Sequence, residues 1–108
     1  IAGTEGIPSW NSQRQQQLDL FKTTLASLNP DFQVENGYPP NAAGTANLSY
    51  CSNALGERFG ALAMTLEMPF KDTTATPDQI QGWSPERCAK LAHSCLDTLH
   101  LCWDRVMD

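Results

Sequence analysis

The chain has 108 residues, of which 41% are hydrophobic and 18% are charged, and these proportions are typical of globular protein. The formal net charge is -5, and the seven Lys and Arg residues are scattered singly, which leaves no basic stripe for nucleic-acid binding. The apolar runs are far shorter than the roughly 20 residues of a membrane helix. The composition therefore predicts one domain, or part of one, over residues 1–108, with no nucleic-acid and no membrane partner.

The first predicted element is a helix from about Asn11 to Leu28, with Ser9 or Asn11 as its N-cap. Apolar residues at helical spacing predict one buried stripe, which comprises Leu18, Phe21, Leu25 and Leu28. A short strand is predicted at residues 32–34. It is followed by a loop rich in Pro and Gly at residues 36–44.

Residues 46–57 are expected to form a second helix. Its inner face is expected to comprise Leu48, Cys51 and Leu55. The best strand candidate is Ala61–Glu67, where bulky and small residues alternate, as is typical of a central strand covered on both faces.

A final helix begins at Ser84-Pro85-Glu86-Arg87, with Ser84 as its cap, and continues to about Val106. The order helix–strand–helix–strand–helix predicts an α/β fold. Two strands do not complete a sheet, so the fold is either a small layer or part of a larger one.

The final helix carries three cysteines at intervals of seven: Cys88, Cys95 and Cys102. Residues seven apart on a helix are about 10 Å apart, which exceeds the roughly 7 Å that a disulfide can bridge. We therefore expect free thiols on the inner face of the helix and a reducing, cytoplasmic environment. The two histidines, His93 and His100, fall on the opposite face. The pattern therefore predicts no metal site in this helix.

Glu67 is the strongest candidate for a catalytic residue. It follows Leu-Ala-Met-Thr-Leu in the most apolar context of the chain, at the C-terminal end of a predicted strand, where open α/β sheets place their ligands. A buried, apolar setting is one way in which a carboxylate is tuned to act as a general base. The residues alone leave an alternative open, in which Glu67 is an edge carboxylate paired with Arg58 or Lys71.

Tyr38 is a candidate for substrate binding. It lies in the Pro/Gly-rich loop, and loops of this kind often carry binding groups. The alternative is a half-buried aromatic side chain that only packs. Residues 43–45 (Ala-Gly-Thr) are typical of a tight turn before a helix.

Residues 58–72 resemble the strand that carries the catalytic glutamate in zinc carboxypeptidases of the cytosolic carboxypeptidase-like branch. The similarity centres on residues 65–70, Thr-Leu-Glu-Met-Pro-Phe. Residues 1–8 resemble the stretch that follows that branch's third zinc ligand. Residues 29–33 and 37–38 resemble the part between this stretch and the glutamate strand, and the similarity extends weakly through residues 83–88. Nearly the whole chain thus resembles the C-terminal part of a carboxypeptidase catalytic domain, and this implies an α/β/α sandwich.

The resemblance implies a zinc ion whose ligands, a His-x-x-Glu pair and a distant His, lie upstream, so that no residue of this chain is expected to bind the metal. It implies Glu67 as the general base and then acid, and Tyr38, ahead of a Gly-Thr turn, as a side chain that covers the substrate. The substrate would be the C-terminal tail of a peptide or protein. Several relatives prefer acidic tails, which makes Arg58 and Lys71 candidates for a basic pocket. The isolated chain is expected to be inactive.

An alternative function also stays open: the chain could be a non-catalytic α/β interaction or regulatory module that has kept the carboxypeptidase motif. A His-Gly-Asp-Glu stretch immediately upstream of Ile1 would decide for the enzyme. An incomplete sheet exposes an unpaired strand edge, which favours pairing with another copy. We therefore expect a homo-oligomer, with Ala61–Glu67 near the contact.

Overall fold

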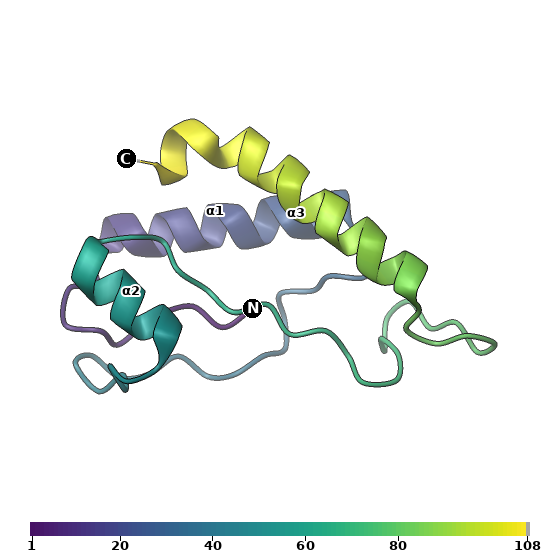
Figure 1. The fold of residues 1–108 in the computed structure, drawn as a ribbon, viewed down its shortest axis with the longest axis horizontal. Helices are drawn as coiled ribbons and strands as arrows, with labels where there is room; N and C mark the ends of the chain where they lie inside the picture. Colours follow the sequence, from purple (N-terminus) through teal and green to yellow (C-terminus); the bar gives the residue numbers. More distant parts are fainter. Residues whose placement is uncertain (108) are drawn as a thin grey trace. The chain divides into compact units, whose positions relative to one another are not determined.

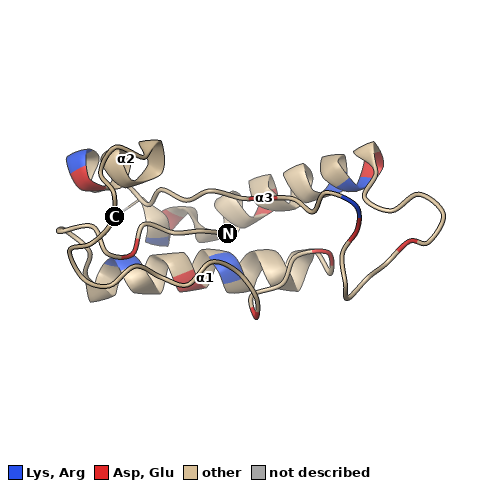
Figure 2. Ribbon diagram, turned by 90° about the horizontal axis from the view of Figure 1, so that it is seen from below, with Lys and Arg blue, Asp and Glu red and all other residues tan. Residues whose placement is uncertain are grey.

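The computed structural model describes residues 1–107. It contains three helices, α1 (Ser12–Leu28), α2 (Cys51–Phe59) and α3 (Pro85–Val106), joined by long irregular segments (Figure 1). Each helix carries both acidic and basic residues (Figure 2), and in α2 the two kinds are adjacent, as Glu57 and Arg58. Within the described residues, no helix is both long enough and apolar enough to span a membrane.

The chain divides into two compact units. The first comprises Ile1–Leu20 and Asn36–Leu66, and the second comprises Phe21–Glu35 and Glu67–Asp108. The first unit therefore holds α2 and the N-terminal part of α1, and the second holds α3 and the C-terminal part of α1.

Helix α1 begins where the sequence predicted. Of the two predicted caps, Asn11 is confirmed, because its side-chain oxygen accepts a hydrogen bond from the backbone N–H of Arg14 at 2.8 Å. Leu18 and Leu25 are fully buried, which confirms the centre of the predicted stripe. Leu28, the last residue of the helix, is 41% exposed, so the stripe does not extend to the helix end.

In the first unit, the N-terminal segment pairs with a distant part of the chain. The backbone groups of Ala2 and Thr65 exchange two hydrogen bonds of 2.8 Å, which form an isolated antiparallel bridge. Gly56 of α2 packs against this segment, because a Cβ atom at Gly56 would lie 3.2 Å from both Thr4 Oγ1 and Ile7 Cδ1. The smallest residue of α2 thus faces the core of the unit.

The predicted inner face of the second helix is wrong. The helix begins at Cys51 rather than at residue 46, and Leu48, Cys51 and Leu55 are all exposed. The buried side of α2 carries Asn53 and Gly56 instead. Asn53 donates from its side-chain nitrogen to the backbone oxygen of Asn47 at 2.9 Å, which satisfies the buried amide. At Gly56 the backbone of α2 lies close to Thr4 and Ile7, and this contact leaves no room for the bulky side chains of α2 on the interior side.

In the second unit, α3 starts as predicted. Ser84 Oγ accepts a hydrogen bond from the Arg87 backbone N–H at 3.3 Å, and Pro85 occupies the first helical position. The helix runs antiparallel to the C-terminal part of α1, since Ser94 Oγ accepts from the Asn29 side-chain amide at 3.2 Å and Cys102 lies 3.5 Å from Thr24 Oγ1.

The buried face of α3 differs in part from the predicted stripe. Leu91 and Cys102 are buried as predicted, but Leu99 is 37% exposed and Thr98 is fully buried beside it. Thr98 donates its hydroxyl hydrogen to the Ser94 backbone oxygen at 2.7 Å, so a polar residue lies inside without an unpaired group.

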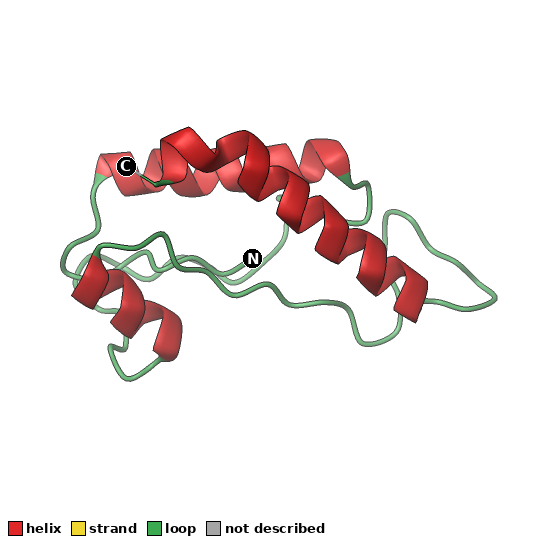
Figure 3. Ribbon diagram, turned by 45° about the horizontal axis from the view of Figure 1, so that its top comes forward, coloured by secondary structure: helices red, strands yellow, loops and turns green. Residues whose placement is uncertain are grey.

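The predicted α/β sandwich is wrong. The part of the chain that the structure describes contains helices and loops but no strand (Figure 3). Residues 32–34 follow a turn in which the Phe32 N–H donates to the Asn29 backbone oxygen at 3.1 Å. In Ala61–Glu67 only Thr65 is paired, with Ala2. Alternating side chains give an extended segment two different faces. A strand also needs a partner segment that pairs with it along its length, and here Ala2 is the one pairing residue.

Replacing Gly6 by Ala is expected to destabilise the protein strongly. Gly6 has φ +94°, and an added Cβ would lie 2.6 Å from Asn41 Cβ and 2.8 Å from the Ala42 oxygen. Gly44→Ala is the matched control, because Gly44 has φ +73° but nothing within 4 Å of an added Cβ. We expect the control to cost about 1 kcal/mol from backbone strain. Gly6→Ala should cost about 1–3 kcal/mol more from the clash. Equal losses in urea unfolding would contradict the close packing at Gly6.

Candidate active site

Glu67 is the first residue of the second unit's long loop, residues 67–84, which leads to α3. The expected apolar burial of this residue is wrong, because Glu67 is exposed. The apolar residues that follow it do not cover it: Met68 is 49% exposed and Phe70 is fully exposed. The predicted burial depended on a central strand with layers on both sides, and that strand is absent from the described residues.

The loop after Glu67 is tied to both helices of its unit by one side chain, Arg87. Its guanidinium binds Asp31 through two hydrogen bonds, from Nε to Oδ2 at 3.1 Å and from Nη2 to Oδ1 at 2.9 Å. Nη1 donates to Asp72 Oδ1 at 2.7 Å. The Arg87 side chain is only 13% exposed. Asp31 follows α1 and Asp72 belongs to the loop, so Arg87 joins three segments.

Further contacts of Arg87 order the middle and end of the loop. Nη2 donates to Thr73 Oγ1 at 2.9 Å and to the Thr76 backbone oxygen at 3.0 Å. Nη1 donates to the Gly82 backbone oxygen at 2.9 Å. The guanidinium carbon lies 4.8 Å from the centre of a Trp83 ring, which is a cation–π contact. The planar guanidinium thereby gives each of its three nitrogens an acceptor.

The charges of this network stabilise one another. The hydrogen bonds from Arg87 lower the pKa of Asp31, and a hydrogen bond from Thr76 contributes in the same direction. The pKa of Asp72 is lowered for the same main reason, with help from the backbone N–H groups of Thr73 and Asp78. The two carboxylates in turn raise the pKa of Arg87. The network therefore favours the fully ionised state.

The sequence prediction used Arg87 only as part of a helix start. A signal for its role was nevertheless present. A cation in the first turn of a helix opposes the helix dipole, and such a residue needs acidic partners from elsewhere. The partners could not be identified from sequence, because Asp31 is 56 positions away.

The other predicted site residues are distributed over both units. Tyr38 and Arg58 belong to the first unit, and Glu67 and Lys71 to the second. Tyr38 is 68% exposed. The Arg58 guanidinium carbon lies 5.4 Å from the ring centre of its neighbour Phe59. Lys71 is exposed, and its backbone oxygen accepts a hydrogen bond from the backbone N–H of residue 83 at 2.7 Å.

The described residues do not provide a metal-binding group. Among residues 1–107, no set of three or more His, Cys, Asp and Glu side chains could hold a metal ion. All four cysteines are free. Cys102 is buried, burial raises the pKa of the Cys95 thiol, and Cys88 Sγ accepts a hydrogen bond from the Trp83 indole at 2.9 Å. The residues present therefore do not fit a zinc site of their own.

No protein-family model matches the sequence. Over 99 residues the chain is 43% identical to an uncharacterized protein of Zymomonas mobilis, and this match covers 92% of the chain and 26% of that protein. Among solved structures, the chain is similar to a metallo-carboxypeptidase from Pseudomonas aeruginosa in complex with (2-guanidinoethylmercapto)succinic acid. That similarity has a TM-score of 0.93 and 36% identity, and covers 97% of this chain and 28% of the Pseudomonas chain.

A metallo-carboxypeptidase from Burkholderia cenocepacia is similar with a TM-score of 0.84 and 37% identity, over 95% of this chain and 27% of that one. The structural neighbours are metallo-carboxypeptidases. The chain spans about a quarter of the length of these proteins and matches the C-terminal part of their fold. The predicted resemblance is confirmed at this level, whereas the cytosolic-like branch stays a prediction.

The Arg87 network predicts a dependence of stability on pH. Because the pKa of Asp31 is lower in the folded than in the unfolded state, the carboxylate stabilises the fold above about pH 4, and this contribution is lost as the pH falls through the folded-state pKa. Asp31→Asn should therefore lower the free energy of unfolding at neutral pH by about 1 kcal/mol, a value reduced for solvent screening. It should also weaken the loss of stability in acid.

Asp104→Asn, at an exposed position of α3, is the control for this experiment and should leave the acid profile unchanged. Urea unfolding at a series of pH values measures both effects. If the free energies of unfolding of the wild type and Asp31→Asn fell in parallel with decreasing pH, the network would not couple stability to pH.

Proposed function

We propose that the chain is part of a zinc-dependent carboxypeptidase that removes C-terminal amino acids from peptides or protein tails. The observation that carries this proposal is the match of nearly the whole chain to the Pseudomonas metallo-carboxypeptidase at 36% identity and a TM-score of 0.93. The compound in that complex carries two carboxyl groups and a guanidino group, and a C-terminal arginine likewise carries a carboxylate and a guanidinium group. This chemistry supports a C-terminal residue as the group that is recognised.

Glu67 is the general base in this proposal. As a water oxygen attacks the scissile carbonyl carbon, the Glu67 carboxylate takes a proton from the water. As the carbon–nitrogen bond breaks, the same group returns the proton to the leaving amine. The exposure of Glu67 supports this role, since the carboxylate is accessible to water and substrate. The Arg87 network supports it further by anchoring, through Asp72, the loop that Glu67 begins.

The metal ligands are assigned to parts of the protein outside residues 1–107, because the described residues contain no suitable group. Tyr38 is proposed to cover the substrate, and its exposure to solvent is consistent with that role. Arg58 and Lys71 remain candidates for contacts to an acidic tail. The four free thiols support a cytoplasmic location.

A second candidate function is a non-catalytic interaction module. One observation favours it: the loop that follows Glu67 exposes two large apolar side chains almost completely, Phe70 and Ile80 at 94%. Exposed apolar residues of this size often mark a surface that another protein or another domain covers. The two functions are distinguished by the role of Glu67, because an interaction module does not need its carboxylate as a base.

Glu67→Gln tests the proposed catalytic role in the intact protein. The substitution keeps the shape of the side chain but removes its ability to accept a proton. We expect kcat for release of C-terminal amino acids to fall by about 10²–10⁴-fold. Metal content, thermal unfolding and KM should stay close to those of the wild type, because the exposed side chain contributes little to the core.

Tyr38→Phe is the control in the same assay and should reduce kcat far less, since a covering tyrosine contributes binding more than chemistry. A Glu67→Gln variant that kept more than about a tenth of the wild-type kcat would exclude Glu67 as the base. The similarity to metallo-carboxypeptidases would then be one of fold alone.

A further inference from the structure

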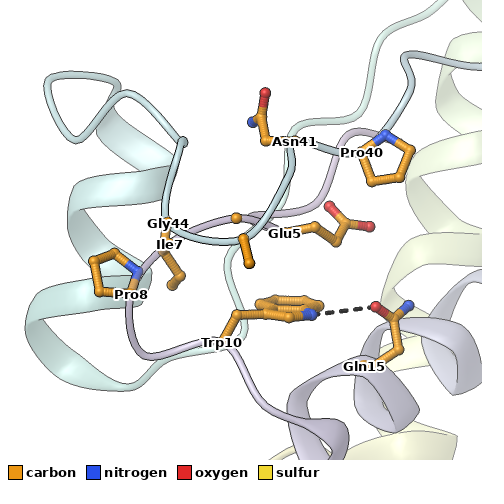
Figure 4. A pocket seen from close by; sticks show the side chains of 10 residues that line it. Glu5, Ile7, Pro8, Trp10, Gln15, Pro40, Asn41 and Gly44 are labelled. Atoms are coloured by element: carbon orange, nitrogen blue, oxygen red, sulfur yellow. Dashed lines mark hydrogen bonds between the residues drawn. The ribbon is translucent and has the colours of Figure 1, made fainter.

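The first unit contains a pocket of about 550 Å³ that the proposed reaction does not use. Three segments that are distant in the sequence line it: the N-terminal segment, the first turn of α1 and the loop before α2. Figure 4 shows the side chains of Glu5, Trp10 and Pro40 around the same space. A volume of this size is within the usual range of small-ligand sites.

The walls of this pocket are held in place by hydrogen bonds and close packing. The Trp10 indole N–H donates to Gln15 Oε1 at 3.2 Å, and the Gln15 amide nitrogen donates to Asp19 Oδ1 at 3.0 Å (Figure 4). The backbone N–H of Ala46 donates to the Gly6 oxygen at 3.1 Å, which fixes the loop against the N-terminal segment. The pocket is therefore formed before any ligand arrives, and the orientation of the indole is set.

The charge in this pocket is negative. Glu5 is partly buried, and its carboxylate folds back over Gly3, where a Cβ atom would lie 2.7 Å from Glu5 Oε2. None of the ten lining residues is Lys or Arg. The ion pairs of Arg87 with Asp31 and Asp72 do not include Glu5. A partly buried carboxylate without a cation has a desolvation cost that a positively charged ligand would offset.

The other lining groups suit the rest of such a ligand. The face of a Trp ring attracts guanidinium and ammonium groups, which gain most when the site also excludes water. Pro8 and Pro40 offer apolar surface to a hydrocarbon stem. A carboxylate, an indole face and apolar walls together match an organic cation on a short aliphatic chain better than an anion or a purely apolar group.

We propose that this pocket binds an organic cation of the guanidinium or ammonium type, such as the side chain of an Arg or Lys residue, with Glu5 as the counter-ion and Trp10 as the aromatic partner. Binding of a cation in this pocket does not require the proposed chemistry at Glu67. A protein that lost no activity on Glu67→Gln would still contain this pocket.

N-acetyl-arginine amide is the probe for this site, because it carries the cation but lacks the terminal carboxylate of a carboxypeptidase substrate. N-acetyl-citrulline amide has nearly the same shape and no charge, and serves as the matched ligand. Binding is followed in the intact protein through the indole N–H signal of Trp10 in ¹H–¹⁵N NMR spectra, assigned with Trp10→Phe. We expect a saturable shift with the arginine compound and none of comparable size with the citrulline compound.

Glu5→Gln should weaken the binding of N-acetyl-arginine amide by about tenfold or more, which corresponds to the loss of one charge-assisted contact. Glu86→Gln is the control, because it changes the net charge equally at an exposed position in the other unit. If the arginine and citrulline compounds shifted the Trp10 indole signal of the wild-type protein equally, that result alone would overturn the proposal. Equal binding by Glu5→Gln and Glu86→Gln would overturn it as well.

Discussion

The second unit depends on the pairing of one guanidinium. Arg87 is 13% exposed, and a charge with so little access to water is stable only if its hydrogen-bond donors are satisfied. Asp31, at the end of α1, supplies two acceptors, and the loop after Glu67 supplies the others. This loop has no helix or strand of its own, so side-chain hydrogen bonds replace a backbone ladder in setting its course. The position of Glu67 at the start of the loop therefore depends on contacts made many residues later.

The same interaction explains why α3 has a basic residue in its first turn. Helix N-termini favour acids, and Glu86 meets that preference, whereas Arg87 opposes it. The unfavourable placement is offset because two carboxylates and four further oxygens of the loop accept hydrogen bonds from the guanidinium. The unfavourable interaction of Arg87 with the helix dipole is thus offset by its hydrogen bonds to residues far away in the sequence. The N-cap hydrogen bond at Ser84 keeps the start of α3 in place.

Features that depend on neighbouring residues were predictable from the sequence. The caps at Asn11 and Ser84 and the buried Leu18 and Leu25 follow from spacing within one helix. The inner face of α2 was not predictable from hydrophobicity, because a close backbone approach at Gly56 decides it. The partners of Arg87 and the walls of the Glu5 pocket come from residues up to 56 positions apart, and no periodic pattern reports such contacts.

The segment Ala61–Glu67 shows how a strand pattern and a strand differ. Alternation of large and small side chains is a property of an extended backbone, and it is present whether or not neighbours pair with it. A ladder of hydrogen bonds is a property of two chains or two segments together. Here Ala2 pairs with Thr65 alone, so the segment has one rung. A close match of the backbone path to a carboxypeptidase fold is compatible with this, since a TM-score compares positions and not pairing.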